Sequence, residues 1–249
     1  MTSSVIVKTE FSIPFRTGAL RGDCFTHEDT APPLLPLLLL HGGGKLTSRV
    51  PYDPLRQTLL QRSLPSFSFD FFGHGQTGGN LLESSLQQRV EESCAVIEAT
   101  ILRRPFGLIG SSMAGYTAIQ LLEKYPISHL VLIVPAVYHV DACTPQFGQG
   151  FTEIIRQPKS WLHSDAWDRI KQFTGKLLII YAENDDIIPA EIVHRLYESA
   201  ANTEKKELYL VKNSSHRILT YLLENPNEFQ KVADSIAEFL TNAYARSAL

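Results

Sequence analysis

The sequence predicts an α/β fold, with a mostly parallel eight-stranded sheet and helices on both of its faces. Short apolar runs alternate along the chain with segments of helical periodicity, and this alternation is typical of a parallel sheet covered on both sides. A length of 249 residues and a hydrophobic content of 44% suit one sizeable core. We therefore expect residues 1–249 to form a single domain.

Eight apolar runs are the expected strands, because each is short and bounded by turn residues. No helical segment separates the first two, so these should pair as an antiparallel hairpin. The expected strands are Val5–Phe11, Ala19–Phe25, Leu34–Leu40, Ser66–Phe71, Phe106–Gly110, Leu130–Val134, Leu177–Tyr181 and Glu207–Val211.

Two helices are predicted by apolar residues that recur every three or four positions, and both should lie on the sheet. Asn225-Pro226 marks the start of the second, because asparagine caps helices and proline fits the first helical position. Pro189 marks a third helix, over residues 191–200, in the same way. The two stripes are Leu86, Val90, Cys94, Ile97 and Ile101, and Phe229, Val232, Ile236, Phe239 and Ala243.

From about residue 136 to 173 the strand rhythm gives way to a segment rich in Gln, Gly and aromatic residues. An insertion there should lie over the carboxyl ends of the strands, where open α/β sheets bind ligands. We expect a small helical cap. Its aromatic side chains can form a core of their own, and Trp161 or Tyr138 can also line a substrate pocket.

Charge and cysteine content exclude several classes of protein. The net charge is −3 and the pI about 6.2, without basic runs interleaved with aromatics, so no nucleic-acid partner is expected. Three widely spaced cysteines favour neither a disulfide framework nor a metal site. The apolar run 34–40 is too short to span a membrane. These features predict a cytoplasmic protein, and its oligomeric state stays open.

Ser112 is the candidate nucleophile, because it lies in a tight turn between an apolar strand and a helix. The segment 106–116 reads FGLIGSSMAGY, with small residues at positions 110, 114 and 115. A strand that turns abruptly into a helix needs small residues on both sides of the apex and presents the serine at its tip. The alternative is a helix N-cap serine.

A serine hydroxyl needs a base to take its proton and a carboxylate to orient that base. His216 is the expected base, because it follows the last strand in the loop Lys212-Asn-Ser-Ser-His-Arg217. Asp185 is the expected acid, because it leaves its strand early enough to point at the histidine. Asp186 is the alternative acid, and Glu183 is a third choice.

The negative charge that develops on the substrate oxygen needs hydrogen-bond donors. The strand 34–40 ends in His41-Gly-Gly-Gly44, whose backbone can approach a ligand without obstruction by side chains. We assign this role to the backbone N–H groups of Gly43 and Met113. His41 and His74 lie in tight turns and are expected to be structural.

Taken in order, these motifs resemble the α/β-hydrolase superfamily from about residue 34 to 240. The resemblance rests on the motifs already described, on Asp70-Phe-Phe-Gly-His-Gly75 and on Asp185 ahead of Ile187-Ile-Pro189. It implies the α/β-hydrolase fold, with Ser112, Asp185 and His216 as catalytic residues and Gly43 and Met113 as oxyanion donors. Ala114 departs from the usual glycine of the turn.

The subfamily stays open, since the triple glycine resembles the hormone-sensitive-lipase group. The segment near Asp70 instead resembles small capped esterases and lysophospholipase-like and serine aminopeptidase-like hydrolases. The expected function is hydrolysis of a carboxylic ester (EC 3.1), a thioester or a small amide, with a small acyl substrate. The alternatives are carbon–carbon bond hydrolysis, perhydrolysis and a catalytically silent binding protein.

No cofactor or metal is expected. Gly73-His-Gly-Gln-Thr-Gly78 has the glycine spacing of a dinucleotide site, but it lies outside a first βαβ unit and too far from the next helix. Gly44-Lys45 lacks the glycine and the hydroxyl residue of a phosphate loop.

Overall fold

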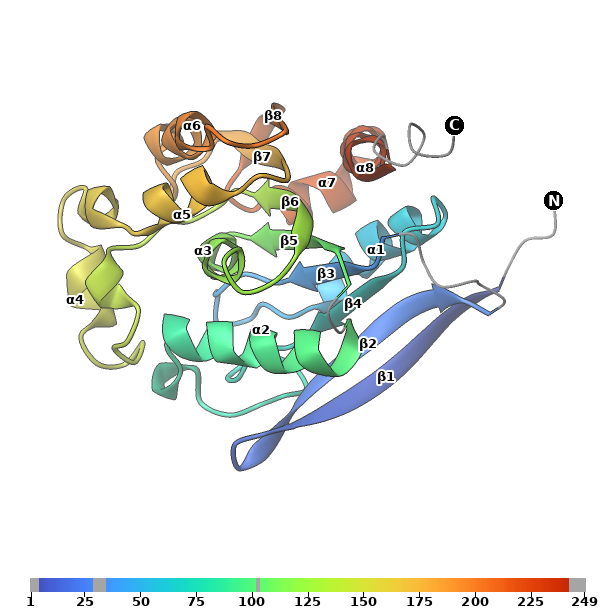
Figure 1. Cartoon of the computed structure of the whole chain (residues 1–249), viewed down its shortest axis with the longest axis horizontal. Helices are drawn as coiled ribbons and strands as arrows, with labels where there is room; N and C mark the ends of the chain where they lie inside the picture. The colour runs from blue at the N-terminus through green and yellow to red at the C-terminus, as the bar shows by residue number, and fades with distance from the viewer. Residues whose placement is uncertain (1–4, 29–34, 102–103, 242–249) are drawn as a thin grey trace.

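A single eight-stranded sheet runs through the molecule, with helices packed on both faces (Figure 1). The computed structural model describes residues 5–28, 35–101 and 104–241. The strand order is β1-β2-β4-β3-β5-β6-β7-β8. This arrangement confirms the eight-stranded α/β architecture, with helices on both faces of the sheet, that the sequence predicts.

The sheet is parallel from β4 to β8 and antiparallel at its β1 edge. β1 and β2 form the predicted hairpin, in register from Ile6–His27 to Phe15–Gly18. The central strands are buried on both faces and therefore read as continuous apolar runs. The strands are β1 (Ile6–Phe15), β2 (Gly18–His27), β3 (Leu37–Leu40), β4 (Ser66–Phe69), β5 (Phe106–Ser111), β6 (Ile127–Ile133), β7 (Lys176–Asn184) and β8 (Lys205–Ser215).

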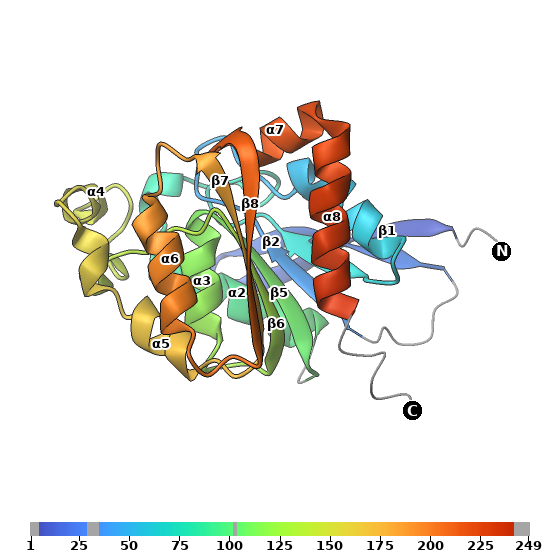
Figure 2. The ribbon, with the colours of Figure 1, turned by 90° about the horizontal axis from the view of Figure 1, so that it is seen from above.

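Two helical layers enclose the sheet (Figure 2). The helices α2, α3, α5 and α6 cover one face, and α1, α7 and α8 cover the other. The α-helices are α1 (Asp53–Leu60), α2 (Leu86–Thr100), α3 (Met113–Leu121), α4 (Phe151–Ile155), α5 (Ala166–Gln172), α6 (Ala190–Ser199), α7 (Ile218–Glu224) and α8 (Pro226–Thr241). Short 3-10 helices are η1 (Val50–Tyr52), η2 (Leu81–Glu83), η3 (Val140–Ala142) and η4 (Ser160–His163). Within the described ranges, none of the helices is long and apolar enough to cross a bilayer.

The helix predictions meet mixed outcomes. α8 begins at Pro226 and buries Val232, Ile236 and Phe239, as the stripe predicts, whereas Ala243 lies outside the described residues. α6 begins at Ala190, with Pro189 one position earlier, at the N-cap.

In α2 the prediction of the buried face is only partly right. Val90 and Cys94 are half-buried, and the face that packs on the sheet includes Arg89, Glu92 and Ser93. The buried face of α2 includes polar side chains that have hydrogen-bond partners in the interior, and a search for periodic apolar residues does not detect such side chains.

The strand predictions are correct in number and order along the chain, but they differ at the ends. β8 begins and ends beyond the expected limits of 207–211, because it pairs along most of its length with β7. β3 begins at Leu37, and the expected start at Leu34 lies outside the described residues. The helices α1 and α7 were not predicted.

The connection between β6 and β7, residues 134–175, holds η3, α4, η4 and α5. Figures 1 and 2 both place α4 at the end of the molecule away from α8. Its aromatic side chains pack on one another, with ring centroids 4.8 Å apart for Phe147 and Phe151 and 6.1 Å apart for Trp161 and Trp167. The predicted aromatic cluster of this segment is therefore present.

Candidate active site

Ser112 lies at the turn between β5 and α3, and its backbone is held in an unusual conformation. Its φ is 52° and its ψ −119°, a region that costs non-glycine residues on the order of 1–3 kcal/mol. The turn is tight: a Cβ added to Gly110 would lie 2.6 Å from the Ala114 carbonyl oxygen. Small residues around the apex are thus required by close backbone contacts, and the strained serine points out of the sheet.

Ser112, His216 and Asp185 form a continuous chain of hydrogen bonds. Ser112 Oγ lies 3.0 Å from His216 Nε2, and His216 Nδ1 lies 2.9 Å from Asp185 Oδ2. The side chain of His216 is 17% exposed and that of Asp185 is 10% exposed, while Ser112 is half-buried. The cluster therefore has access to solvent at its serine end and a sheltered carboxylate at the other.

The geometry distinguishes the three acidic candidates. Asp185 Oδ1 accepts hydrogen bonds from the backbone N–H groups of Ile187 and Ile188, at 3.0 and 2.8 Å, which hold the carboxylate toward His216. Asp186 is exposed. Glu183 is also exposed and accepts a bond of 2.7 Å from the Asn213 N–H. Of the three, Asp185 is the one that contacts the histidine.

The end of β8 delivers His216 through an irregular backbone. The β7–β8 register shifts between Ala182 and Asn184, and Asn213 adopts a positive φ of 56°. The buried Ser214 hydroxyl donates to the Val211 carbonyl at 2.7 Å and closes this turn. An irregularity of this kind redirects the following side chain.

The glycine loop after β3 lies against the serine. A Cβ added to Gly42 would lie 3.4 Å from Ser112 Cβ, and one added to Gly43 would lie 2.4 Å from Met113 Sδ. Met113 is the first residue of α3, so its N–H has no acceptor within the helix. Within the described ranges, the Gly43 N–H also donates to no protein acceptor. The structure thus brings Gly43 and Met113 together beside Ser112.

His41 and His74 support this loop from within. His41 is fully buried; its Nε2 accepts from the Phe71 N–H at 3.1 Å, so its proton lies on Nδ1, 2.8 Å from the Gly42 carbonyl oxygen. Burial and the neighbouring Arg89 lower the pKa of His41 well below its usual range. Burial and Arg89 also lower the pKa of His74. Both rings are therefore neutral near pH 7, in keeping with the structural role predicted for them.

A buried ion network fixes the segment after the glycine loop. Arg49 donates its Nε to Asp23 at 2.6 Å, its backbone N–H to Asp70 at 2.8 Å and its Nη1 to the same Asp70 carboxylate. Arg56 donates to Asp23 at 2.5 Å. All four side chains are buried, and the two guanidinium groups are matched there by two carboxylates. The network ties the glycine loop to β2 and β4.

Asp165 links α3 to the β6–β7 connection. Its carboxylate accepts from Tyr116 Oη at 2.8 Å, from Gln120 Nε2 at 2.9 Å and from Arg169 Nε at 2.8 Å. Tyr116 lies one turn beyond Ser112 and packs edge-on against Tyr138, with ring centroids 5.6 Å apart. The connection is thereby anchored close to the serine.

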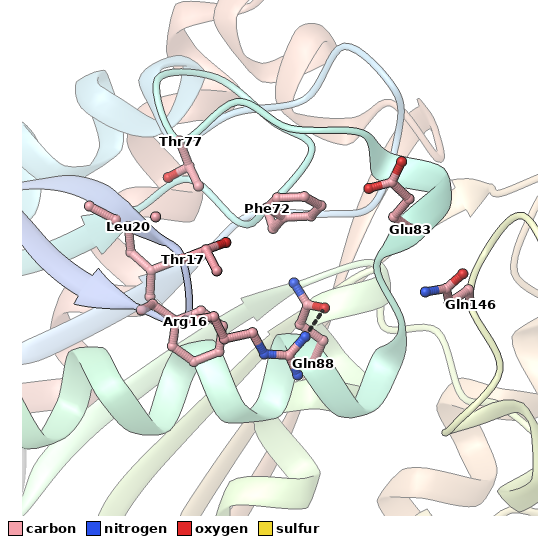
Figure 3. Close-up of a pocket in the computed structure, with 11 residues that line it drawn as sticks. Arg16, Thr17, Leu20, Phe72, Thr77, Glu83, Gln88 and Gln146 are labelled. Atoms are coloured by element: carbon pink, nitrogen blue, oxygen red, sulfur yellow. Dashed lines mark hydrogen bonds between the residues drawn. The ribbon is translucent and has the colours of Figure 1, made fainter.

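A cavity of about 440 Å³ lies elsewhere, between the turn of the β1–β2 hairpin, the loop after β4 and the start of α2 (Figure 3). Figure 3 shows Arg16 reaching Gln88, to which it donates a hydrogen bond of 2.8 Å. Neither Ser112 nor His216 lines this cavity. Within the part of the chain that the structure describes, no cluster of three or more His, Cys, Asp or Glu could hold a metal ion.

Apolar periodicity does not reveal Arg89, a fully buried residue of α2 that donates to the carbonyl oxygens of His41 and Gly42 at 2.8 and 3.1 Å. A signal was available: Arg89 lies three residues after Leu86 and four before Ser93, on the face of α2 that packs inward. A charged residue at such a position requires an explanation.

Comparison with known proteins identifies the wider group. The family model described as "Serine aminopeptidase, S33" matches residues 31–164, more than half of the chain. The uncharacterized protein R595 of Acanthamoeba polyphaga mimivirus is 29% identical over 100 residues, or 39% of this chain and 31% of that protein. The match therefore spans about a third of that relative's length.

Solved structures share the fold along nearly the whole chain. The serine hydrolase CCSP0084 of Cycloclasticus zankles has a TM-score of 0.73 at 15% identity, covering 96% of this chain and 99% of that one. The esterase Pf2001 of Pyrococcus furiosus has a TM-score of 0.66 at 21% identity, covering 96% and 93%. At these identities the likeness establishes the fold.

Proposed function

The chain belongs to the serine aminopeptidase family S33 of α/β-hydrolase-fold hydrolases, and from this premise we propose that it is a serine hydrolase that cleaves a carboxylic ester through an acyl-Ser112 intermediate. One observation carries the proposal: the chain of hydrogen bonds from Ser112 Oγ through His216 to Asp185. Oxygen nucleophiles are activated by this arrangement of hydroxyl, imidazole and carboxylate on many folds.

In the first half-reaction Ser112 Oγ attacks the ester carbonyl carbon while its proton passes to His216 Nε2. Asp185 accepts the Nδ1–H, which keeps the Nε2 lone pair facing the serine and stabilises the imidazolium that forms. The tetrahedral intermediate collapses, the carbon–oxygen bond to the alcohol breaks, and Nε2–H protonates the departing alkoxide. An acyl-Ser112 ester and a free alcohol result.

In the second half-reaction a water molecule attacks the acyl carbon and gives its proton to His216 Nε2. The bond between the acyl carbon and Ser112 Oγ breaks, and the proton returns to the serine. In both halves negative charge gathers on the former carbonyl oxygen, and the proposed donors to that oxygen are the N–H groups of Gly43 and Met113. Each such donor contributes about 10²–10³ to the rate in enzymes of this kind.

An apolar acyl group is the substrate class that the surroundings favour. Tyr138 packs on Tyr116, one turn from Ser112, and Phe151 packs on Tyr138 with ring centroids 5.6 Å apart. These aromatic side chains are half-buried or buried, and pockets for small organic ligands are lined mainly by such groups. The proposed substrate is therefore a carboxylic ester of an apolar acyl group.

A substrate panel tests the proposal. Aryl esters of graded acyl length, matching thioesters and aminoacyl anilides are offered to the wild type, to Ser112→Ala and to Ser128→Ala, which alters a half-buried serine at the start of β6. The wild type and Ser128→Ala should hydrolyse the esters, and Ser112→Ala should lose at least 10³-fold in kcat. Equal turnover by Ser112→Ala would contradict the proposal. Turnover of the anilides alone would replace the ester by an amide.

A further inference from the structure

Arg89 of α2 is a buried cation with an unusual set of partners. Its Nη2 donates to the carbonyl oxygens of His41 and Gly42, and its guanidinium carbon lies 3.6 Å from the centre of the Phe71 ring. Among the described residues, no carboxylate lies within ion-pair distance, and its Nε and Nη1 have no hydrogen-bond partner. Among the described residues, its hydrogen bonds therefore go to two carbonyl oxygens of the glycine loop.

The charge on Arg89 is retained in spite of its burial. Burial lowers the pKa of Arg89 to about 10, with partial compensation from Glu92 one turn along the helix, so the guanidinium remains protonated at neutral pH. An interior cation without a close counter-ion is costly, and apolar residues of similar volume often serve stability better. Natural proteins keep energetically costly groups of this kind mainly at functional sites.

The Gly42 carbonyl oxygen accepts hydrogen bonds from two donors. Besides Arg89 Nη2 at 3.1 Å, it receives His41 Nδ1 at 2.8 Å, while the Thr47 hydroxyl donates to the neighbouring Gly44 carbonyl oxygen at 2.7 Å. In a trans peptide the C=O of one residue and the N–H of the next point in opposite directions. The two donors on Gly42 O thus fix the direction of the Gly43 N–H.

The same contacts change the electrostatics of that peptide. A cation at the carbonyl oxygen polarises the amide and makes its hydrogen more positive, because bonds in a hydrogen-bonded chain strengthen one another in a low dielectric. Gly43 lies against Met113 and follows Gly42, which lies against Ser112; the Gly43 N–H has no protein acceptor among the described residues. In the proposed reaction this N–H donates a hydrogen bond to the developing oxyanion.

We propose that Arg89 is a positioning residue of the oxyanion site, acting through the Gly42–Gly43 peptide: it orients the Gly43 N–H and strengthens it as a donor. The inference rests on the proposed function, since it concerns the charge that develops during acyl transfer. It gives the buried cation of α2 a role in the rate of the reaction, with little effect on the binding of the ground-state ester.

The test compares Arg89→Met, Arg89→Lys and the control Ser93→Ala, which removes a buried hydroxyl that donates to the Arg89 carbonyl on the same helix. Each is assayed with an ester and with its thionoester, in which sulfur, a weak hydrogen-bond acceptor, replaces the carbonyl oxygen. Arg89→Met should lower kcat for the ester roughly 10- to 100-fold, a part of the loss expected for a missing donor, with KM nearly unchanged. The thionoester rate should fall much less, and Arg89→Lys should recover part of the ester rate.

Stability and the amide itself provide independent readouts. Arg89→Met should melt at the same or a higher temperature than the wild type, and in protein labelled with ¹⁵N-glycine the Gly43 amide proton should shift upfield. Ser93→Ala should change neither the ratio of ester to thionoester rates nor that shift. If Arg89→Met unfolds, the test is made on Arg89→Lys, by measuring the ratio of ester to thionoester rates and the position of the Gly43 amide resonance.

The outcomes separate the two claims. A wild type that hydrolyses esters, with an Arg89→Met rate equal to it or reduced equally for ester and thionoester, would overturn the role of Arg89 alone. An unchanged Gly43 resonance in the variant would overturn the polarisation of the peptide. A wild type that hydrolyses no ester would overturn the proposed function and the role of Arg89 with it.

Discussion

His216 Nε2 lies 3.0 Å from Ser112 Oγ, although the two residues are separated by 104 positions in the chain. The contact joins the turn after the central strand β5 to the irregular end of the edge strand β8. Parallel strands make it possible, because their carboxyl ends meet at one edge of the sheet. The loop after β7, which lies between these strands in the sheet, supplies Asp185.

Asp185→Asn should impair the proposed reaction severely. An amide in place of the carboxylate can present its NH₂ to the imidazole and favour the wrong tautomer, so kcat should fall by about 10⁴. Asp186→Asn, one residue away and exposed, is the matched control and should retain nearly full activity. Steady-state kinetics with one ester decide between them, and the reverse ranking would assign the acid to Asp186.

Gly110→Ala should distort the turn that carries Ser112. The new Cβ would lie 2.6 Å from the Ala114 carbonyl oxygen, which belongs to the backbone and cannot rotate away. Overpacking of this kind costs about 1–3 kcal/mol in the free energy of unfolding, and ester hydrolysis should fall with it. Gly18→Ala adds a Cβ that meets no atom within 4 Å and should be neutral in denaturant unfolding. Equal stability of the two variants would contradict the geometry of the turn.

Asp23→Asn should destabilise the protein strongly at neutral pH. Burial alone would raise the pKa of Asp23, but Arg56 and Arg49 outweigh it and hold the pKa below its usual range. The variant leaves both guanidinium groups buried with too little negative charge, at about 3–5 kcal/mol in the free energy of unfolding.

The pH dependence of this effect has a definite sign. Because the folded-state pKa of Asp23 is depressed, its stabilising contribution is present above the ordinary value of 3.8 and is lost as the pH falls through the lower folded value. Urea unfolding of wild type and variant at several pH values should give curves that converge below about pH 4. A difference that stays constant with pH would argue against the ionised pairing.

His129, a buried residue of β6, should make unfolding sensitive to mild acid. Burial, with a smaller effect of Lys176, lowers its pKa to about 4. Between the ordinary value of 6.5 and that value the unfolded chain binds the proton and the folded chain does not, so stability falls on acidification, by on the order of 3 kcal/mol. His129→Gln should flatten the dependence of the free energy of unfolding on pH over this range. Identical slopes in both proteins would refute this.

The fold was accessible from the sequence because the central strands are buried on both faces. Runs such as Leu37–Leu40 and Phe106–Ser111 carry their signal without any tertiary information. The order of strands in the sheet and the helices α1 and α7 were not accessible in the same way. Short helices of seven or eight residues depend on packing for their stability.

The sequence predicted which loops meet at the candidate site, but the choice of residue within a loop required the structure. The choice between Asp185 and Asp186 depends on which side chain the backbone directs toward His216, and this follows from the N–H groups of Ile187 and Ile188. Arg89 was missed because patterns of apolar residues assign charged groups to the surface. The catalytic roles of Ser112, His216 and Asp185 stay predictions of the account.

The central claim is that Ser112 is an activated nucleophile, and stoichiometric labelling with a fluorophosphonate tests it most directly. The intact wild-type protein should gain the mass of one phosphonyl group, and peptide mapping should place the group on Ser112 rather than on the adjacent Ser111. Ser112→Ala should stay unlabelled, and His216→Ala should react far more slowly because its serine keeps its proton. One equivalent of label on Ser112→Ala, or a fully folded wild-type protein that remains unlabelled, would contradict this claim.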